Sequence, residues 1–262
     1  MKSIELPHKV TLQYVEQGDP AGVPVLLLHG VTDSWHSFEP VLPHLPSSLH
    51  AFALTQRGHG DSDRPLGYRT RDFAADVAEF VKALGVGPTV IVGHSMGATN
   101  AQRFVIDHPE RALGLVLAGT FAGYRSNPMV LELWESTIAR LTDPVDPGFV
   151  REFQESTLAK PVPRVFLETV VAESLKVPAR VWRAAFEGFL EDDVARELGK
   201  IRAPTLIMWG TRDALAKRPD QDALLRAIPG SRLVAYESAG HALHWEEPKR
   251  FAEDLVAFVR TL

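Results

Sequence analysis

The sequence contains no cysteine, no excess of positive charge and no long apolar run. Without cysteine, disulfide bonds, thiolate metal sites and a cysteine nucleophile are excluded. The 33 Asp and Glu residues outnumber the 28 Lys and Arg residues, and the net charge of -5 argues against nucleic acid or an anionic membrane as the principal partner. We therefore expect a small-molecule substrate as the partner, and these observations leave the oligomeric state open.

No stretch approaches the ~18 consecutive apolar residues that a membrane helix needs. Residues 1–16 alternate charged and apolar side chains and lack the apolar core of a signal peptide. These two features predict a cytoplasmic protein. With 262 residues, 45% of them hydrophobic, the chain can bury a sizeable core as one large α/β domain or two smaller ones.

Short apolar runs alternate with amphipathic segments over the first 120 residues. We predict strands at 4–6, 10–15, 23–28, 49–54, 90–92 and 113–118, and helices at 38–45, 70–84 and 97–107. Such alternation favours a mostly parallel sheet with helices on both faces. Ligands of these α/β sheets gather at the carboxyl ends of the strands.

Residues 121–198 show no convincing strand, and six prolines divide them into segments of helical length. The amphipathic segments 130–141 and 165–175 need an apolar surface to cover, and the mouth of the sheet offers one. We predict a helical cap over 121–198 on a core of 1–120 and 199–262, the alternative being a plain helical subdomain without a gating role. Beyond the cap, strands are expected at 205–209 and 232–236 and helices at 220–227 and 248–259.

A Gly-x-Ser-x-Gly pattern joins the apolar run at 90–92 to the helical segment that follows it: Gly93, Ser95 and Gly97. The two glycines let strand and helix approach closely, so that a tight turn presents the Ser95 hydroxyl. A helix N-terminus also offers free backbone N–H groups to an oxyanion. We predict that Ser95 is an acyl-transfer nucleophile, the alternative being a Gly-rich turn that happens to contain serine.

A serine hydroxyl needs a general base and a third group that orients the base. His241 lies in a Gly-flanked loop after the last predicted strand, at the same sheet edge as Ser95, and is the expected base; His244 is its rival. Asp213 follows the strand at 205–209 and is the expected acid, with an Asx turn as its alternative role. Other carboxylates fall in helical or cap segments and are expected on the surface: Asp192, Asp193, Asp220 and Asp222.

The oxyanion hole is expected to use the backbone N–H groups of Met96 and Val31, one from the helix start and one from the loop after the strand at 23–28. An apolar pocket is expected next to these groups, although core packing is an equal alternative for each aromatic residue. The candidate pocket residues are Trp35, His94, Phe121, Trp134 and Leu215. We expect no metal ion and no cofactor.

Several motifs taken together resemble the α/β-hydrolase superfamily, specifically its capped serine hydrolases such as esterases, enol-lactonases and prolyl aminopeptidases. The motifs are LLLHG at 26–30, RGHGDS at 57–62, GHSMG at 93–97, WGTRD at 209–213, and Gly240-His241 followed by Glu247-Pro248. The resemblance covers nearly the whole chain. It implies an eight-stranded sheet with a cap after the sixth strand, a triad of Ser95, His241 and Asp213, and hydrolysis through an acyl-enzyme.

The sequence departs from this family pattern at three positions. Thr55 stands where members with a similar second loop usually carry Asp, which does not touch the triad. Ser95 replaces the nucleophilic Asp of dehalogenases and epoxide hydrolases, and Val31 replaces an aromatic residue frequent in haloperoxidase-like members. The differences at Ser95 and Val31 argue against dehalogenase, epoxide hydrolase and haloperoxidase activity.

We expect a serine hydrolase that cleaves a small, largely apolar carboxylic ester or lactone. Two alternatives use the same residues differently. One is a hydrolase or lyase of carbon–carbon bonds, and the other is a ligand-sensing, receptor-like protein with residual hydrolysis.

Overall fold

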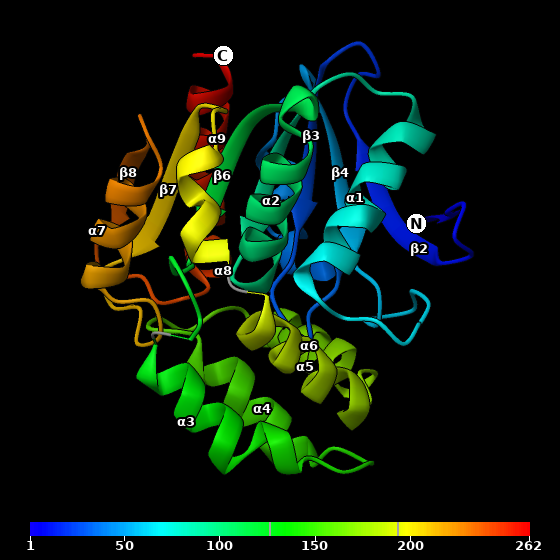
Figure 1. Ribbon diagram of the computed structural model, residues 1–262, viewed down its shortest axis with the longest axis vertical. Helices are drawn as coiled ribbons and strands as arrows, with labels where there is room; N and C mark the ends of the chain where they lie inside the picture. Colours follow the sequence, from blue (N-terminus) through cyan, green and yellow to red (C-terminus); the bar gives the residue numbers. More distant parts are fainter. Residues whose placement is uncertain (126, 193) are drawn as a thin grey trace.

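The structure is a computed structural model that describes residues 1–125, 127–192 and 194–262. In this part of the chain, eight strands form one sheet in the order β1-β2-β4-β3-β5-β6-β7-β8 (Figure 1). Strand β2 pairs antiparallel with β1 and β4, and the other neighbours pair in parallel. The strands are β1 (Lys2–Glu5), β2 (Thr11–Gln17), β3 (Val23–Leu28), β4 (Leu49–Thr55), β5 (Thr89–His94), β6 (Ala112–Ala118), β7 (Thr205–Gly210) and β8 (Arg232–Tyr236). The prediction of a mostly parallel eight-stranded sheet is confirmed.

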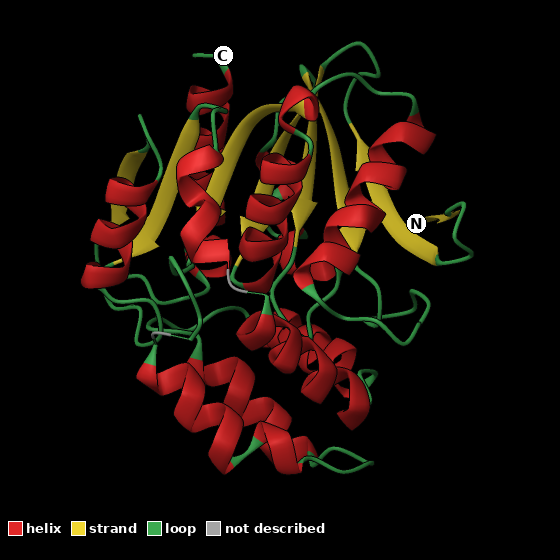
Figure 2. Cartoon of the chain, viewed as in Figure 1, coloured by secondary structure: helices red, strands yellow, loops and turns green. Residues whose placement is uncertain are grey.

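Helices cover both faces of the sheet (Figure 2). Successive side chains of the buried strands point to opposite sides, so each strand contributes apolar residues to both faces. Leu26 and Leu28 face α1 (Thr70–Leu84), α2 (Met96–Asp107), α7 (Arg218–Ala227) and the 3-10 helix η5 (Val194–Lys200). Val25 and Leu27 face the 3-10 helices η1 (Trp35–Phe38) and η2 (Leu42–His44) together with α8 (Leu243–Glu246) and α9 (Pro248–Val259). A further 3-10 helix, η3, covers Pro109–Arg111. Each core cluster therefore lies between the sheet and one helical layer.

The expected helix at 38–45 is wrong. Two 3-10 helices, η1 and η2, occupy this region instead. Pro40, Pro43 and Pro46 remove three backbone N–H groups within seven residues, so a continuous α-helical ladder cannot form.

Four helices lie together at the end of the sheet to which the parallel strands point (Figure 1). They are α3 (Pro128–Ser136), α4 (Pro147–Ser156), α5 (Arg164–Leu175) and α6 (Ala179–Glu191), with the 3-10 helix η4 (Ile138–Arg140) after α3. The prolines that divide this segment also start its helices: α3 and α4 begin with proline, and Asn127 and Asp146 before them accept backbone N–H groups as N-caps. None of the described helices combines the length and apolar character needed to span a bilayer.

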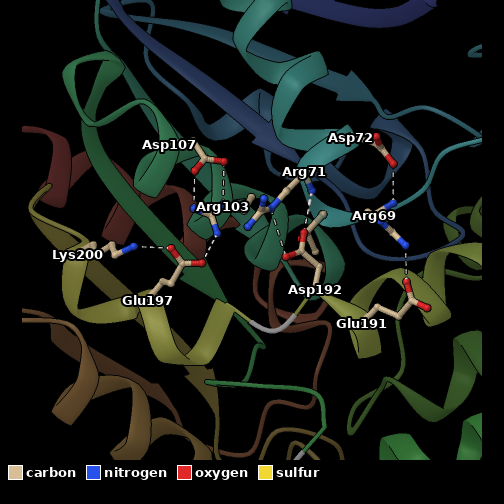
Figure 3. A network of polar contacts seen from close by, with 10 residues as sticks. Arg69, Arg71, Asp72, Arg103, Asp107, Glu191, Asp192, Glu197 and Lys200 are labelled. Carbon is tan, nitrogen blue, oxygen red and sulfur yellow. Dashed lines mark hydrogen bonds and ion pairs between the residues drawn. The ribbon is translucent and has the colours of Figure 1, made fainter.

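The segment that returns from these helices to the sheet is held by arginines of α1 and α2 (Figure 3). Arg103 of α2, only 2% exposed, binds Asp107 on its own helix and Glu197 of η5, the latter at 2.8 Å. Near the start of α1, Arg69 lies 3.0 Å from Glu191 and Arg71 lies 3.6 Å from Asp192. These pairs hold Glu191, Asp192 and Glu197 against α2 and the start of α1.

Candidate active site

Ser95 occupies the turn between β5 and α2. Its backbone angles, φ 52° and ψ -116°, lie in a region that residues other than glycine rarely adopt. The turn is tied to the neighbouring strand β6, because the Ser95 N–H donates to the carbonyl oxygen of Ala118 at 3.0 Å. The strained turn therefore holds the serine at the carboxyl end of a central strand.

Gly93 and Gly97 allow this turn to form. A Cβ atom on Gly93 would lie 2.3 Å from the carbonyl oxygen of Gly97, and one on Gly97 would lie 2.2 Å from the carbonyl oxygen of Leu28. Both distances are far below van der Waals contact and involve backbone atoms, which cannot rotate away. Neither position has room for a side chain.

Asp213 and His241 come from the loops after β7 and β8. Nδ1 of His241 lies 2.8 Å from Oδ2 of Asp213, and the two side chains are 4% and 0% exposed. The other carboxylate oxygen, Oδ1, accepts the backbone N–H groups of Leu215 and Ala216 at 2.8 and 2.9 Å. Because Nδ1 carries the proton shared with the carboxylate, Nε2 of a neutral His241 is left unprotonated and can act as a base.

His244, the rival base, is fully buried away from this pair. Its Nε2 atom lies 3.1 Å from the hydroxyl of Ser37, and its ring lies between Phe38 and Phe251. Burial lowers the pKa of His244 to about 3, so the ring is neutral. It does not line the cavity that contains Ser95 and His241.

A cavity at the carboxyl ends of the strands is lined by both Ser95 and His241. Most of its wall is apolar and comes from the β6–α3 connection, from α4 and α6 and from the loop after Asp213: Phe121, Tyr124, Phe153, Phe186, Phe189 and Leu215. The cavity leaves about 50 Å³ for the centres of water-sized molecules. This is room for a few waters, so it suits only a small substrate group.

The expected pocket residues fall into two groups. His94, Phe121 and Leu215 line the cavity, whereas Trp35 and Trp134 do not. The loop after β3 turns away into η1, where the Trp35 ring stacks on His36 with the ring centroids 3.9 Å apart. In α3, Trp134 lies about 100° further around the helix than Leu133, and Leu133 faces the cavity.

Two backbone N–H groups are available near Ser95. Val31 lines the cavity, and Met96 is the first residue of α2. Within the part of the chain that the structure describes, neither N–H donates to a protein acceptor. They are free to bind an anionic oxygen.

The cavity residues that the sequence analysis missed include three with polar groups: Asp33, Tyr124 and Gln154. Asp33 lies just beyond the end of β3, and its position at a strand end was a usable signal. Tyr124 and Gln154 belong to the connection after β6 and to α4, whose packing no local pattern fixes. The Tyr124 phenol accepts a hydrogen bond from Thr99 at 3.1 Å, and burial raises its pKa to about 12, so the phenol remains protonated.

The alternative carboxylates lie elsewhere. Asp192 pairs with Arg71, Asp220 accepts the backbone N–H of Lys217, and Asp222 pairs with Arg218. None of these three lines the cavity. Asp193 lies outside the described residues.

The strained serine turn and the sheet place this chain among hydrolases built on an α/β core. A sequence model of the Alpha/beta hydrolase family matches residues 25–254, and the chain belongs to that family. The resemblance of the motifs to the α/β-hydrolase superfamily is thereby confirmed. The protein is an α/β-hydrolase enzyme.

Several proteins similar to this chain are hydrolases. The soluble epoxide hydrolase of Corynebacterium sp. (strain C12) is 28% identical across 96% of this chain and 94% of that protein. A 2-(acetamidomethylene)succinate hydrolase of Mesorhizobium japonicum is 36% identical over 109 residues, which span 41% of this chain but only 38% of that enzyme. A thermophilic esterase from Thermogutta terrifontis, solved with malate bound, has a TM-score of 0.88 and 27% identity, covering 100% of this chain and 99% of that one.

Proposed function

We propose that this enzyme is a serine hydrolase that cleaves a small, largely apolar carboxylic ester or lactone. The observation that carries the proposal is the 2.8 Å contact between His241 and Asp213 at a cavity that Ser95 also lines. A base already oriented by a buried carboxylate, at a cavity that the nucleophile also lines, is the arrangement that acyl transfer requires. Similarity to the Thermogutta esterase supports an ester as the substrate.

In the first half of the reaction, Nε2 of His241 takes the proton of the Ser95 hydroxyl while Oγ attacks the carbonyl carbon. The resulting oxyanion binds the N–H groups of Val31 and Met96, and Asp213 stabilises the imidazolium form of His241. His241 then gives its proton to the departing alkoxide oxygen. The carbon–oxygen bond breaks and leaves the acyl group as an ester on Ser95.

In the second half, His241 takes a proton from a water molecule that attacks the acyl-enzyme. A second oxyanion forms in the same hole and collapses with release of Oγ. The proton on His241 returns to Ser95, and the carboxylic acid leaves. The residues regain their starting state, and one water has been consumed.

We further infer that α3 to α6 form a cap over this site. Their contribution is the apolar wall, which includes Leu133, Phe153, Phe186 and Phe189. A narrow apolar wall favours a short hydrocarbon group and excludes most of the water that would compete with the oxyanion donors.

The test is turnover of p-nitrophenyl esters of increasing acyl length and of simple lactones by the wild type, Ser95→Ala and Ser3→Ala. Ser3 is an exposed serine on β1 and provides the matched control. We expect Ser95→Ala to lose at least about a thousandfold in kcat/KM, as nucleophile removal does in other serine hydrolases, and Ser3→Ala to match the wild type. Equal turnover by wild type and Ser95→Ala across the panel would overturn the proposal.

A further inference from the structure

Asp33 brings a carboxylate into a cavity that is otherwise mainly apolar. Its side chain is 3% exposed and lines the cavity together with Ser95 and His241. Its side-chain partners in the described part of the chain are Ser37 and Gln154, and no lysine or arginine there forms an ion pair with it. A buried carboxylate without a cation costs free energy unless hydrogen-bond donors surround it, so the donors around Asp33 are informative.

Neighbouring side chains hold Asp33 as a hydrogen-bond acceptor. The Ser37 hydroxyl accepts from Nε1 of Trp245 at 3.0 Å, and Nε2 of His244 lies 3.1 Å from it on a second side. The Ser37 hydroxyl donates its single proton to Oδ2 of Asp33, 3.1 Å away. Gln154 of α4 donates to Oδ1 at 3.0 Å.

These donors do not use the full capacity of the carboxylate. An ionised carboxylate offers about four acceptor positions; the two side-chain donors occupy two of them, and the backbone N–H of Gly30 also bonds the carboxylate. Burial raises the pKa of Asp33 to about 6, so the group is mostly ionised at neutral pH and still accepts. Acceptor capacity is left over in a group that lines the cavity.

A second unused acceptor comes from His94. Its Nε2 lies 3.1 Å from the carbonyl oxygen of His241, to which only a protonated ring nitrogen can donate. Nδ1 consequently carries a lone pair, and it has no partner among the described residues. His94 is 3% exposed and lines the same cavity, and burial beside His244 and His241 lowers its pKa well below the usual value.

Gly30 brings the two acceptors together. A Cβ atom built on Gly30 would lie 3.0 Å from Nδ1 of His94 and 3.1 Å from Oδ2 of Asp33. Since both distances start from one point, the two acceptor atoms are no more than about 6 Å apart, and one donor group between them can reach both. Gly30, Asp33 and His94 all line the cavity that Ser95 lines.

We propose that Asp33 and His94 form an acceptor subsite that binds a hydrogen-bond donor of the substrate. The preferred substrate is then an ester or lactone that carries a hydroxyl or ammonium group close to the scissile bond, and an ester carrying a carboxylate there is rejected by the charge of Asp33. This inference rests on the proposed ester hydrolysis at Ser95. It gives Asp33 and His94 a role in recognition and none in bond making.

The first test uses the wild-type enzyme with four methyl esters of one chain length: methyl butanoate, methyl 3-hydroxybutanoate, methyl 3-aminobutanoate and monomethyl succinate. Each kcat/KM is divided by the alkaline hydrolysis rate of that ester, which removes differences in intrinsic reactivity. We expect the hydroxyl or ammonium ester to exceed methyl butanoate about tenfold or more, the range for a hydrogen bond to a charged group. Comparison of the hydroxyl-bearing ester with the ammonium-bearing ester shows whether the subsite prefers a neutral donor or a cation. No preference for either donor would overturn the proposal.

The second test compares Asp33→Asn with Asp61→Asn. Asp61 is an exposed carboxylate, 2.9 Å from Lys176, and provides the same chemical change outside the cavity. Asp33→Asn should lose most of the preference for the donor-bearing ester over methyl butanoate, whereas Asp61→Asn keeps both this preference and the wild-type turnover of methyl butanoate. Equal slowing of all esters by Asp33→Asn would show a structural role and would overturn recognition.

Binding to Ser95→Ala separates this inference from the proposed reaction. The dissociation constants of methyl butanoate and the donor-bearing ester can be measured by NMR titration without turnover. Tighter binding of the donor-bearing ester by Ser95→Ala, lost in Ser95→Ala/Asp33→Asn, supports the subsite even if no ester is hydrolysed by the wild type. Equal binding of both esters overturns the subsite even if hydrolysis is found.

Discussion

The carboxylate of Asp213 binds His241 through one oxygen and two backbone N–H groups through the other. The backbone bonds to Leu215 and Ala216 fix the plane of the carboxylate, so the imidazole has a single favourable orientation. Asp213 is thus a rigid acceptor set before any substrate arrives. This relationship makes the role of its charge testable.

Asp213→Asn should lower kcat/KM for the best ester by about three to four orders of magnitude. An amide keeps Oδ1 as an acceptor for the backbone but can turn an N–H group toward Nδ1 of His241. The ring then moves its proton to Nε2, where a base is needed. Turnover is measured near pH 7, and far-ultraviolet circular dichroism verifies that the fold is retained.

The matched control for this change is Asp222→Asn, an exposed carboxylate on α7 that pairs with Arg218. It should retain wild-type turnover. If Asp213→Asn retained more than about a tenth of the activity, the orienting role of Asp213 would be refuted.

Gly93→Ala should fail to fold or lose several kcal/mol of unfolding free energy, because the new methyl group would meet backbone atoms of Gly97 and Ala98 at 2.3 to 2.5 Å. Gly87 is the control position, since a Cβ there meets nothing within 4 Å. Gly87→Ala should stay within about 0.5 kcal/mol of the wild type. Urea unfolding measures both. Similar stabilities for the two variants would show that the β5–α2 approach is looser than described.

Leu133→Ala should shift the acyl-length optimum toward longer chains. Leu133, Phe153 and Leu215 line the active-site cavity and also a second cavity of about 390 Å³ between α3 and α4, so these side chains form the wall between the two. Shortening Leu133 joins the spaces. The profile of kcat/KM against acyl length, from acetate to octanoate, measures the shift.

Leu131→Ala, on the same helix but outside both cavities, is the control for Leu133→Ala. It should leave the acyl-length profile unchanged. An unaltered profile in Leu133→Ala would mean that the second cavity is not part of the substrate path.

The free energy of unfolding should fall on acidification between pH 6.5 and pH 4, partly because of His59. Burial lowers its pKa to about 4 from the ordinary 6.5. In this window the unfolded chain binds a proton at His59 and the folded chain does not, so the stability present above pH 6.5 is lost as pH falls, by up to about 1.4 kcal/mol per pH unit.

His59→Asn isolates this contribution, since an amide can still donate to the carbonyl of Arg57, which Nδ1 of His59 contacts at 2.7 Å. The slope of unfolding free energy against pH should be shallower in this variant. His44→Asn, at an exposed position on η2, is the control and should keep the wild-type slope. A wild-type slope in His59→Asn would contradict the prediction. Asp33 acts in the opposite sense, because its raised pKa makes the folded state take up a proton first as pH falls through about 6.

Much of the fold follows from local pattern. Helix α1 has apolar residues at helical spacing and ends at Gly85, which adopts the left-handed conformation there, and the predicted range 70–84 coincides with the helix. Strand β8 and helix α9 likewise occupy the predicted ranges. These elements need only their own periodicity and end signals. The helix expected at 38–45 does not form, because Pro40, Pro43 and the following Pro46 outweigh the apolar spacing of this segment.

The candidate site likewise has one part that the sequence predicts and another that it does not. Ser95, Asp213 and His241 follow strand ends, and a parallel sheet brings such ends to one edge whatever the loop details, so sequence could nominate them together. The cavity wall depends on how each helix of 121–198 is rotated. On α3, Leu133 faces the cavity and the next residue, Trp134, does not. The sequence analysis had nominated the tryptophan.

The arginine contacts of Figure 3 make the two connections of α3–α6 to the sheet unequal. The returning segment is held by ion pairs at Glu191, Asp192 and Glu197. The described residues of the outgoing segment are held by hydrogen bonds instead: Tyr124 accepts from Thr99, and Asn127 donates to the carbonyl oxygen of Leu215. For protein engineering, this asymmetry sets the junctions of any exchange of these helices with those of a relative. If the exchanged segment ends before Glu191, the protein keeps its own ion pairs at this junction. If it ends after Glu197, the new segment must itself carry acidic residues that pair with Arg69, Arg71 and Arg103.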